Sequence, residues 1–238
     1  MSEELRMFVE IGFNVLYLIV VWTMNAVMSL QMDRVPQKDQ KVASLFRWAF
    51  ILLALGDTGH VGFRVAAYAL GGIEKNSLLI GMGALATAIT VTFFYVVMLY
   101  IWRERFNGKF GLLEYILLAS VPVRFIVMAF PQNDWGSNVP PAFWGPFRNL
   151  FLVILGVGVL YLYLRDSIKA KDRLFRWMGY CVFFSYLFYT PVILLARDIP
   201  IIGMLMIPKT IMYVAIQFLA YFGLWTQKEN IPIPSATD

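Results

Sequence analysis

The residues whose types and spacing best suit chemistry lie in the stretch 56–64, which contains Asp57, His60 and Arg64. Their spacing of i, i+3 and i+7 would place a carboxylate, an imidazole and a guanidinium on one face of a helix. His60 is the only histidine in the chain, and an imidazole can give or take a proton near neutral pH. Asp57 and His60 are therefore the candidates for general acid–base catalysis, if the protein is an enzyme.

A second set of candidate residues consists of cations that lie deep inside long apolar runs. Guanidinium and ammonium groups bind carboxylate, phosphate and sulfate through charge-assisted hydrogen bonds. Because a charge at bilayer depth is costly, such residues generally face a bundle interior or a watery cavity. The four cations are Arg64, Arg124, Arg148 and Lys209. They predict an anion-binding cavity, with Asn14 and Asn149 as further members, and neither a metal nor a cofactor is expected.

The elements that must position these residues are apolar segments of about 20 residues. The chain has 238 residues, 60% of them hydrophobic, whereas soluble domains are about 45–50% apolar. Seven runs are each long enough to cross a hydrocarbon layer of about 30 Å: 8–31, 45–70, 78–102, 112–130, 146–164, 177–196 and 201–225. Their apolar character is continuous, not alternating, which excludes a barrel. The predicted fold is an all-α membrane protein, a single seven-transmembrane helix bundle over 1–238 with a tail at 226–238.

The distribution of Lys and Arg predicts how this bundle is oriented. Thirteen lie in or beside the connections that follow the first, third and fifth spans or in the tail, whereas only Arg6, Lys75 and Arg197 lie on the other side. Short loops rich in Lys and Arg stay in the cytoplasm. We therefore expect a multi-pass protein of the cell membrane with its N-terminus outside and its C-terminus cytoplasmic. The four buried cations then lie in the outer half, where Glu10 and Asp57 are the acidic residues.

The longest outer connection, 131–146, has no Lys or Arg but contains Trp135, Trp144, Pro140 and Pro141. This composition suits an ordered lid that lies along the membrane interface. A proline-rich spacer with aromatic anchors explains it equally well. The single cysteine, Cys181, excludes an intramolecular disulfide and a thiolate metal cluster.

Two classes of function fit these observations. In the first, an outward-facing cationic cavity binds an anionic small molecule or a lipid headgroup, for binding alone, for transport or for sensing. A receptor of this kind would need a protein partner at its cytoplasmic loops, and no nucleic acid partner is expected. In the second, the protein is an intramembrane enzyme acting on a lipid, with Asp57 orienting His60 and an arginine stabilising negative charge. No Ser or Cys nucleophile is evident.

A third possibility follows from topology. Seven helices with an external N-terminus resemble the microbial rhodopsins, and the resemblance implies retinal bound through Lys209. Lys209 lies nearer the outer end of its span than that family requires, however, and 78–102 contains no Asp or Glu to serve as counterion. The segment 51–57 resembles a Gly-Asp segment of membrane lysoplasmalogenases over only a few residues. A single histidine cannot reproduce the zinc site of the alkaline ceramidases.

Overall fold

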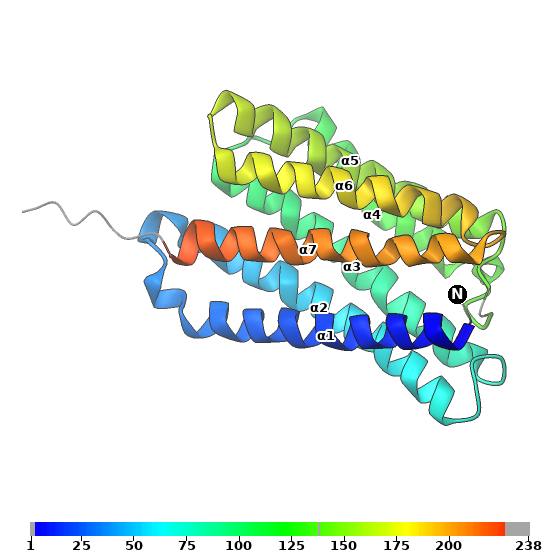
Figure 1. Ribbon diagram of the computed structural model, residues 1–238. Coiled ribbons are helices and arrows are strands. Elements are labelled where there is room, and N and C mark those ends of the chain that lie inside the picture. Colours follow the sequence, from blue (N-terminus) through cyan, green and yellow to red (C-terminus); the bar gives the residue numbers. More distant parts are fainter. Residues whose placement is uncertain (1–2, 138, 227–238) are drawn as a thin grey trace, which may run out of the picture.

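The computed structural model describes residues 3–137 and 139–226 and consists of seven long helices (Figure 1). They are α1 Glu3–Leu30, α2 Gln40–Ala69, α3 Ser77–Phe106, α4 Leu112–Ala129, α5 Trp144–Lys169, α6 Arg173–Leu195 and α7 Met206–Ala220. The described residues contain no strand, and seven helical segments are long and apolar enough to cross a membrane. The predicted all-α seven-helix bundle is confirmed, and the chain is an integral membrane protein. The expected tail falls, apart from Thr226, outside the described residues.

The seventh span is less regular than a single apolar run suggests. It begins as a 3-10 helix, η4, over Pro200–Leu205, continues as α7 and ends as a π-helical turn, η5, over Tyr221–Trp225. Pro208 lies in the first turn of α7, where a backbone N–H has no partner within the helix, so that its absence removes no hydrogen bond. Pro122 and Pro191, in contrast, lie inside α4 and α6.

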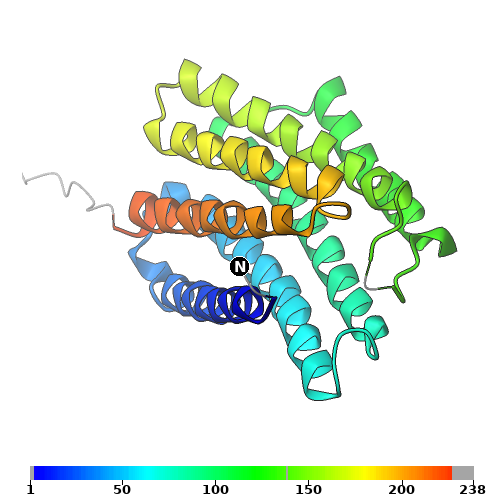
Figure 2. The same cartoon turned by 45° about the vertical axis from the view of Figure 1, so that its right-hand side comes forward.

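The helices pack in sequence order around the bundle, and the ring closes where α7 contacts α1 (Figures 1 and 2). Helix α3 contacts α2, α4 and α5, so it lies toward the middle of the bundle. Figure 2 shows α2 and α3 as a long antiparallel pair, joined by a short turn at the end of the bundle where α1 begins. The candidate site is built against this pair of helices.

Small residues bring α2 and α3 close together beside Asp57 and His60. A Cβ added to Gly56 would collide with the side chain of Thr90, and one added to Gly83 would lie 3.0 Å from the Cα of His60. The hydroxyl of Thr87 donates a hydrogen bond to the carbonyl of Gly56 at 3.0 Å. A Cβ added to Gly59 would lie 3.2 Å from the Cβ of Ala86 of α3, whereas one added to Gly62 would meet no atom within 4 Å.

The main hydrophobic core fills the half of the bundle away from the start of α1. Its centre is a set of contacting aromatic rings, among them Phe46, Phe50, Phe94, Tyr95 and Phe175. Beyond it, Arg105 of α3 donates to Asp39 at 2.8 Å and to Asp172 at 2.9 Å, which ties α3 to the segments before α2 and α6. This half of the bundle is therefore closed by packed side chains.

Candidate functional site

A cavity of about 500 Å³ lies in the other half of the bundle, and all seven transmembrane segments contribute to its lining. The eight polar residues singled out from the sequence all line it: Asn14, Asp57, His60, Arg64, Arg124, Arg148, Asn149 and Lys209. The structure thus brings together residues from α1, α2, α4, α5 and α7 that are far apart in the chain. Their role in binding or catalysis stays a prediction.

Arg124 is the most deeply buried of the cations, with 1% of its surface exposed. Its Nη1 donates to the backbone carbonyl of Arg148 at 2.7 Å, and its Nη2 lies 3.5 Å from Oδ1 of Asn149. Its Nε is buried and has no hydrogen-bond partner among the described residues. These contacts fix the guanidinium of Arg124 against the first turns of α5 and leave its Nε–H donor unused.

Arg148, in the second turn of α5, joins the cavity to the connection 130–143 between α4 and α5. Its guanidinium carbon lies 4.0 Å from the centroid of the Trp135 ring, and its Nη1 donates to the carbonyl of Asn133 at 3.3 Å. Trp135 itself donates to the carbonyl of Met128 at 3.0 Å and lines the cavity. This part of the connection is therefore held against the bundle by Arg148, as the lid interpretation requires, although its function as a lid stays a prediction.

Lys209, in the first turn of α7, is 8% exposed. Its Nζ lies 4.8 Å from the ring centroid of Tyr189 and 5.0 Å from that of Tyr213, distances at which an aromatic ring attracts a cation. Tyr189 also donates to Oδ1 of Asn149 at 3.2 Å, and the hydroxyls of Tyr213 and Tyr95 are 3.0 Å apart. Two tyrosine rings thus hold the ammonium group, which has no hydrogen-bond acceptor among the described residues.

Asp57 and His60 share one face of α2, as their spacing predicts, but the carboxylate has another partner. Tyr17 of α1 donates to Oδ2 of Asp57 at 2.7 Å. Nδ1 of His60 is buried without a hydrogen-bond partner, and no hydrogen bond joins the two side chains in the part of the chain that the structure describes. The geometry expected of an Asp that orients a general base is therefore not made between these two residues.

The charge of the cavity is unbalanced. Its described lining has four cations, Arg64 included, and one carboxylate, that of Asp57. Among the described side chains, which do not include that of Glu10, no carboxylate lies within salt-bridge distance of Arg124, Arg148 or Lys209. Nor do the described residues contain a group of three or more metal-ligating side chains. The arrangement can bind an anion, since it offers charge and donors without an internal partner.

Apart from Trp135, which belongs to the predicted lid, the aromatic part of the lining was not identified from the sequence. Tyr17, Trp135, Tyr186, Tyr189 and Tyr213 all line the cavity. With 12 tyrosines and 7 tryptophans in the chain, residue type alone does not separate cavity aromatics from those of the core or the lipid surface. The one local signal is at Tyr17, which follows Asn14 by three residues and so shares its helix face.

No protein-family model, curated protein or solved structure matches the chain. Its class is therefore defined by the fold alone. The chain is a multi-pass integral membrane protein of seven helices, and anything more particular must come from the cavity.

Proposed function

We propose that this protein binds an anionic small molecule or the anionic headgroup of a lipid in the cavity between its helices. The observation that carries the proposal is the burial of Arg124, Arg148 and Lys209 around one cavity, with no described carboxylate within salt-bridge distance of them. Buried cations are stable when an opposite charge accompanies them. A bound anion would supply negative charge beyond that of Asp57, the one carboxylate of the described lining.

The free donors suit a ligand with several oxygen atoms. Arg124 keeps an unused Nε, and the ammonium of Lys209 lies against two aromatic rings without a hydrogen-bond acceptor among the described residues. Asn149 accepts hydrogen bonds from Arg124 and Tyr189, so we propose that it is a positioning residue. Carboxylate, phosphate and sulfate all offer the acceptors that such a group of donors requires.

The direction of access follows from the excess of Lys and Arg at the opposite end of the bundle. By the positive-inside rule the cavity end faces away from the cytoplasm. The other half is closed by the aromatic core around Phe50, Phe94 and Tyr95. The geometry therefore favours binding from outside. Transport would require these packed rings to separate, and signalling would require a partner protein at the cytoplasmic connections.

Ligand-induced stabilisation tests the proposal. The purified protein is unfolded by heat with phosphate, sulfate or short carboxylates, at constant ionic strength set with chloride. An anion that binds the folded state at about 100 times its Kd stabilises it by about 2.7 kcal/mol. We expect at least one of these anions to raise the unfolding temperature, with saturation. If none does, and anionic lipid headgroups also have no effect, the proposal is wrong.

A further inference from the structure

One part of the cavity lining is apolar. It is formed by the 3-10 helix η4 and the first turn of α7, through Met204, Met206 and Ile207, together with Ala196 and Pro200. A Cβ added to Gly203 in the same segment would meet no atom within 4 Å, so open space adjoins the backbone there. One cavity therefore has cations on α4 and α5 and, at Lys209, on α7, together with apolar side chains on η4 and at the start of α7.

The volume of the cavity exceeds what a simple anion fills. About 500 Å³ is within the range of roughly 300–1,000 Å³ found for sites of drug-sized ligands. A free phosphate or carboxylate ion is far smaller than this. If such an ion bound at Arg124 and Lys209, the apolar walls around Met204 and Ile207 would remain uncovered by ligand.

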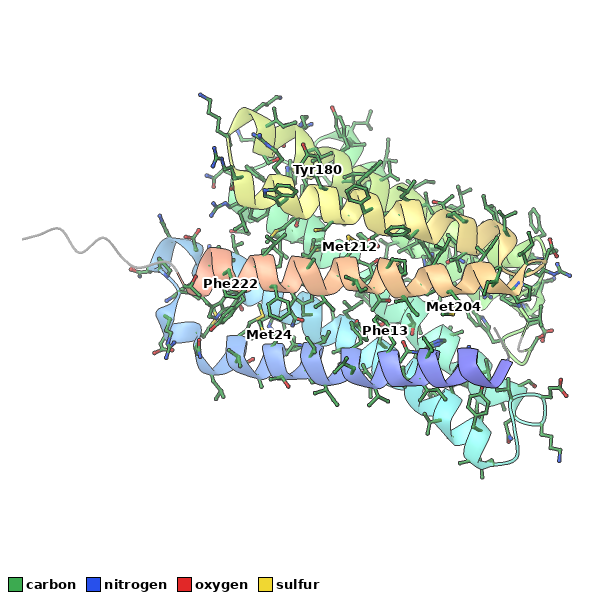
Figure 3. The ribbon with its side chains drawn as sticks, in the orientation of Figure 1. Phe13, Met24, Tyr180, Met204, Met212 and Phe222 are labelled. Carbon is green, nitrogen blue, oxygen red and sulfur yellow. The ribbon has the colours of Figure 1, made fainter. Side chains whose placement is uncertain are left out.

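The apolar region also lies beside the boundary between α1 and α7. The described hydrogen bonds that join these helices begin at Val21 of α1, whose carbonyl accepts from Gln217, and continue through Met28, which accepts from Trp225. The cavity reaches α1 earlier in the chain, at Asn14 and Tyr17. Figure 3 shows the labelled side chains of Phe13 and Met204 between the ribbons of α1 and α7 on this side of those contacts. The side chains packed around Tyr17 and Val21 at this boundary, those of Phe13, Leu18 and Val214, are apolar, so an aliphatic group that extends this way meets apolar side chains.

We infer that the ligand is an amphiphile, with an anionic headgroup at Arg124, Arg148 and Lys209 and an aliphatic chain along Met204, Met206 and Ile207. This inference rests on the proposed anion site and adds the second half of the ligand. A single-chain lipid and a free aliphatic phosphate or carboxylate both have such a headgroup and chain. The chain points toward the boundary between α1 and α7, where it meets the surrounding lipid.

Soluble probes with the same headgroup and different chains test this inference. Methyl phosphate, hexyl phosphate and hexyltrimethylammonium are titrated onto the full-length protein in phosphatidylcholine nanodiscs, with empty discs as the blank. Because each buried methylene contributes about 0.8 kcal/mol, we expect hexyl phosphate to bind at least about 30-fold more tightly than methyl phosphate. We expect no saturable binding of the cation. If the ligand is a lipid of the membrane, lysophosphatidic acid in the disc should compete with hexyl phosphate. If the ligand is a free amphiphile, only the soluble probes should bind.

A matched pair of variants tests whether the aliphatic chain of the ligand contacts the apolar side chains of α7. Ile207→Ser should reduce the preference for hexyl phosphate to less than about 5-fold and leave methyl phosphate binding unchanged. Ile211→Ser, one turn along the same helix at a residue 45% exposed on the outer surface, should keep the preference of the wild type. Met204→Ser in η4 repeats the test if Ile207→Ser does not fold. Equal binding of methyl and hexyl phosphate would overturn the amphiphile and leave the anion site standing, whereas no binding of either phosphate would overturn both.

Discussion

Arg124→Gln is expected to weaken phosphate binding by about 30-fold or more. Removing one partner of a buried, hydrogen-bonded charge pair costs about 2–5 kcal/mol, and each 1.4 kcal/mol is a factor of ten in Kd. Arg124 is the most buried cation of the cavity and retains an unused Nε, so a bound anion would meet it without competition from solvent. Calorimetric titration of wild type and variant with inorganic phosphate measures the change.

The matched control is Arg103→Gln. Arg103 lies in the last turn of α3, at the other end of the bundle, where its guanidinium carbon is 4.7 Å from the centroid of the Phe110 ring. The substitution removes the same charge from the chain. It should leave phosphate affinity within about 2-fold of wild type, because an exposed charge at the opposite end of the bundle from the cavity is largely screened. Equal losses in the two variants would show that net charge, not the cavity, governs binding.

Lys209→Met is expected to raise the stability of the unliganded protein while it abolishes stabilisation by phosphate. The ammonium is buried against two aromatic rings, and no described carboxylate lies within salt-bridge distance of it, so its desolvation is not offset by a direct ion pair. Replacing buried ionic groups by well-packed apolar side chains of similar volume is often neutral or stabilising, by up to about 4 kcal/mol. A methionine also makes favourable sulfur contacts with rings such as those of Tyr189 and Tyr213.

The sign of this effect separates a binding role from a structural one. Thermal unfolding without added anion should occur at a higher temperature in Lys209→Met than in wild type, and added phosphate should no longer shift it. A lower unfolding temperature in the variant would mean that Lys209 holds the bundle together, and the account of an incomplete charge site at α7 would be wrong. Residues that a functional site needs commonly lower the stability of the unliganded protein.

Much of the fold follows from the sequence because two simple physical patterns specify it. Continuous apolar runs of about 20 residues have few structures open to them in a bilayer other than helices, since each backbone polar group must be paired inside the segment. Periodicity of 3.6 residues then places Asp57, His60 and Arg64 on one face of α2. The cost of buried charge identifies Arg124, Arg148 and Lys209 as residues of the interior.

The partners of these residues do not follow from the sequence, because they depend on the rotation of each helix and on its height relative to its neighbours. Asp57 meets Tyr17 of α1 and not His60 of its own helix, a choice set by the packing of α1 against α2. The stacking of Trp135 on Arg148 joins a connection to a helix start. The sequence likewise does not predict the 3-10 helix over 200–205, because an apolar composition suits a 3-10 helix and an α-helix equally.

The most direct measurement is the position of an electron-dense anion in crystals of the protein. After a soak with tungstate, the account predicts an anomalous peak inside the cavity, within hydrogen-bond distance of Arg124 and Lys209, and no such peak in Arg124→Gln crystals soaked in the same way. Tungstate bound only at the basic connections that follow α1, α3 and α5, with the cavity free of it at saturating concentration, would contradict the claim that these buried cations form an anion site.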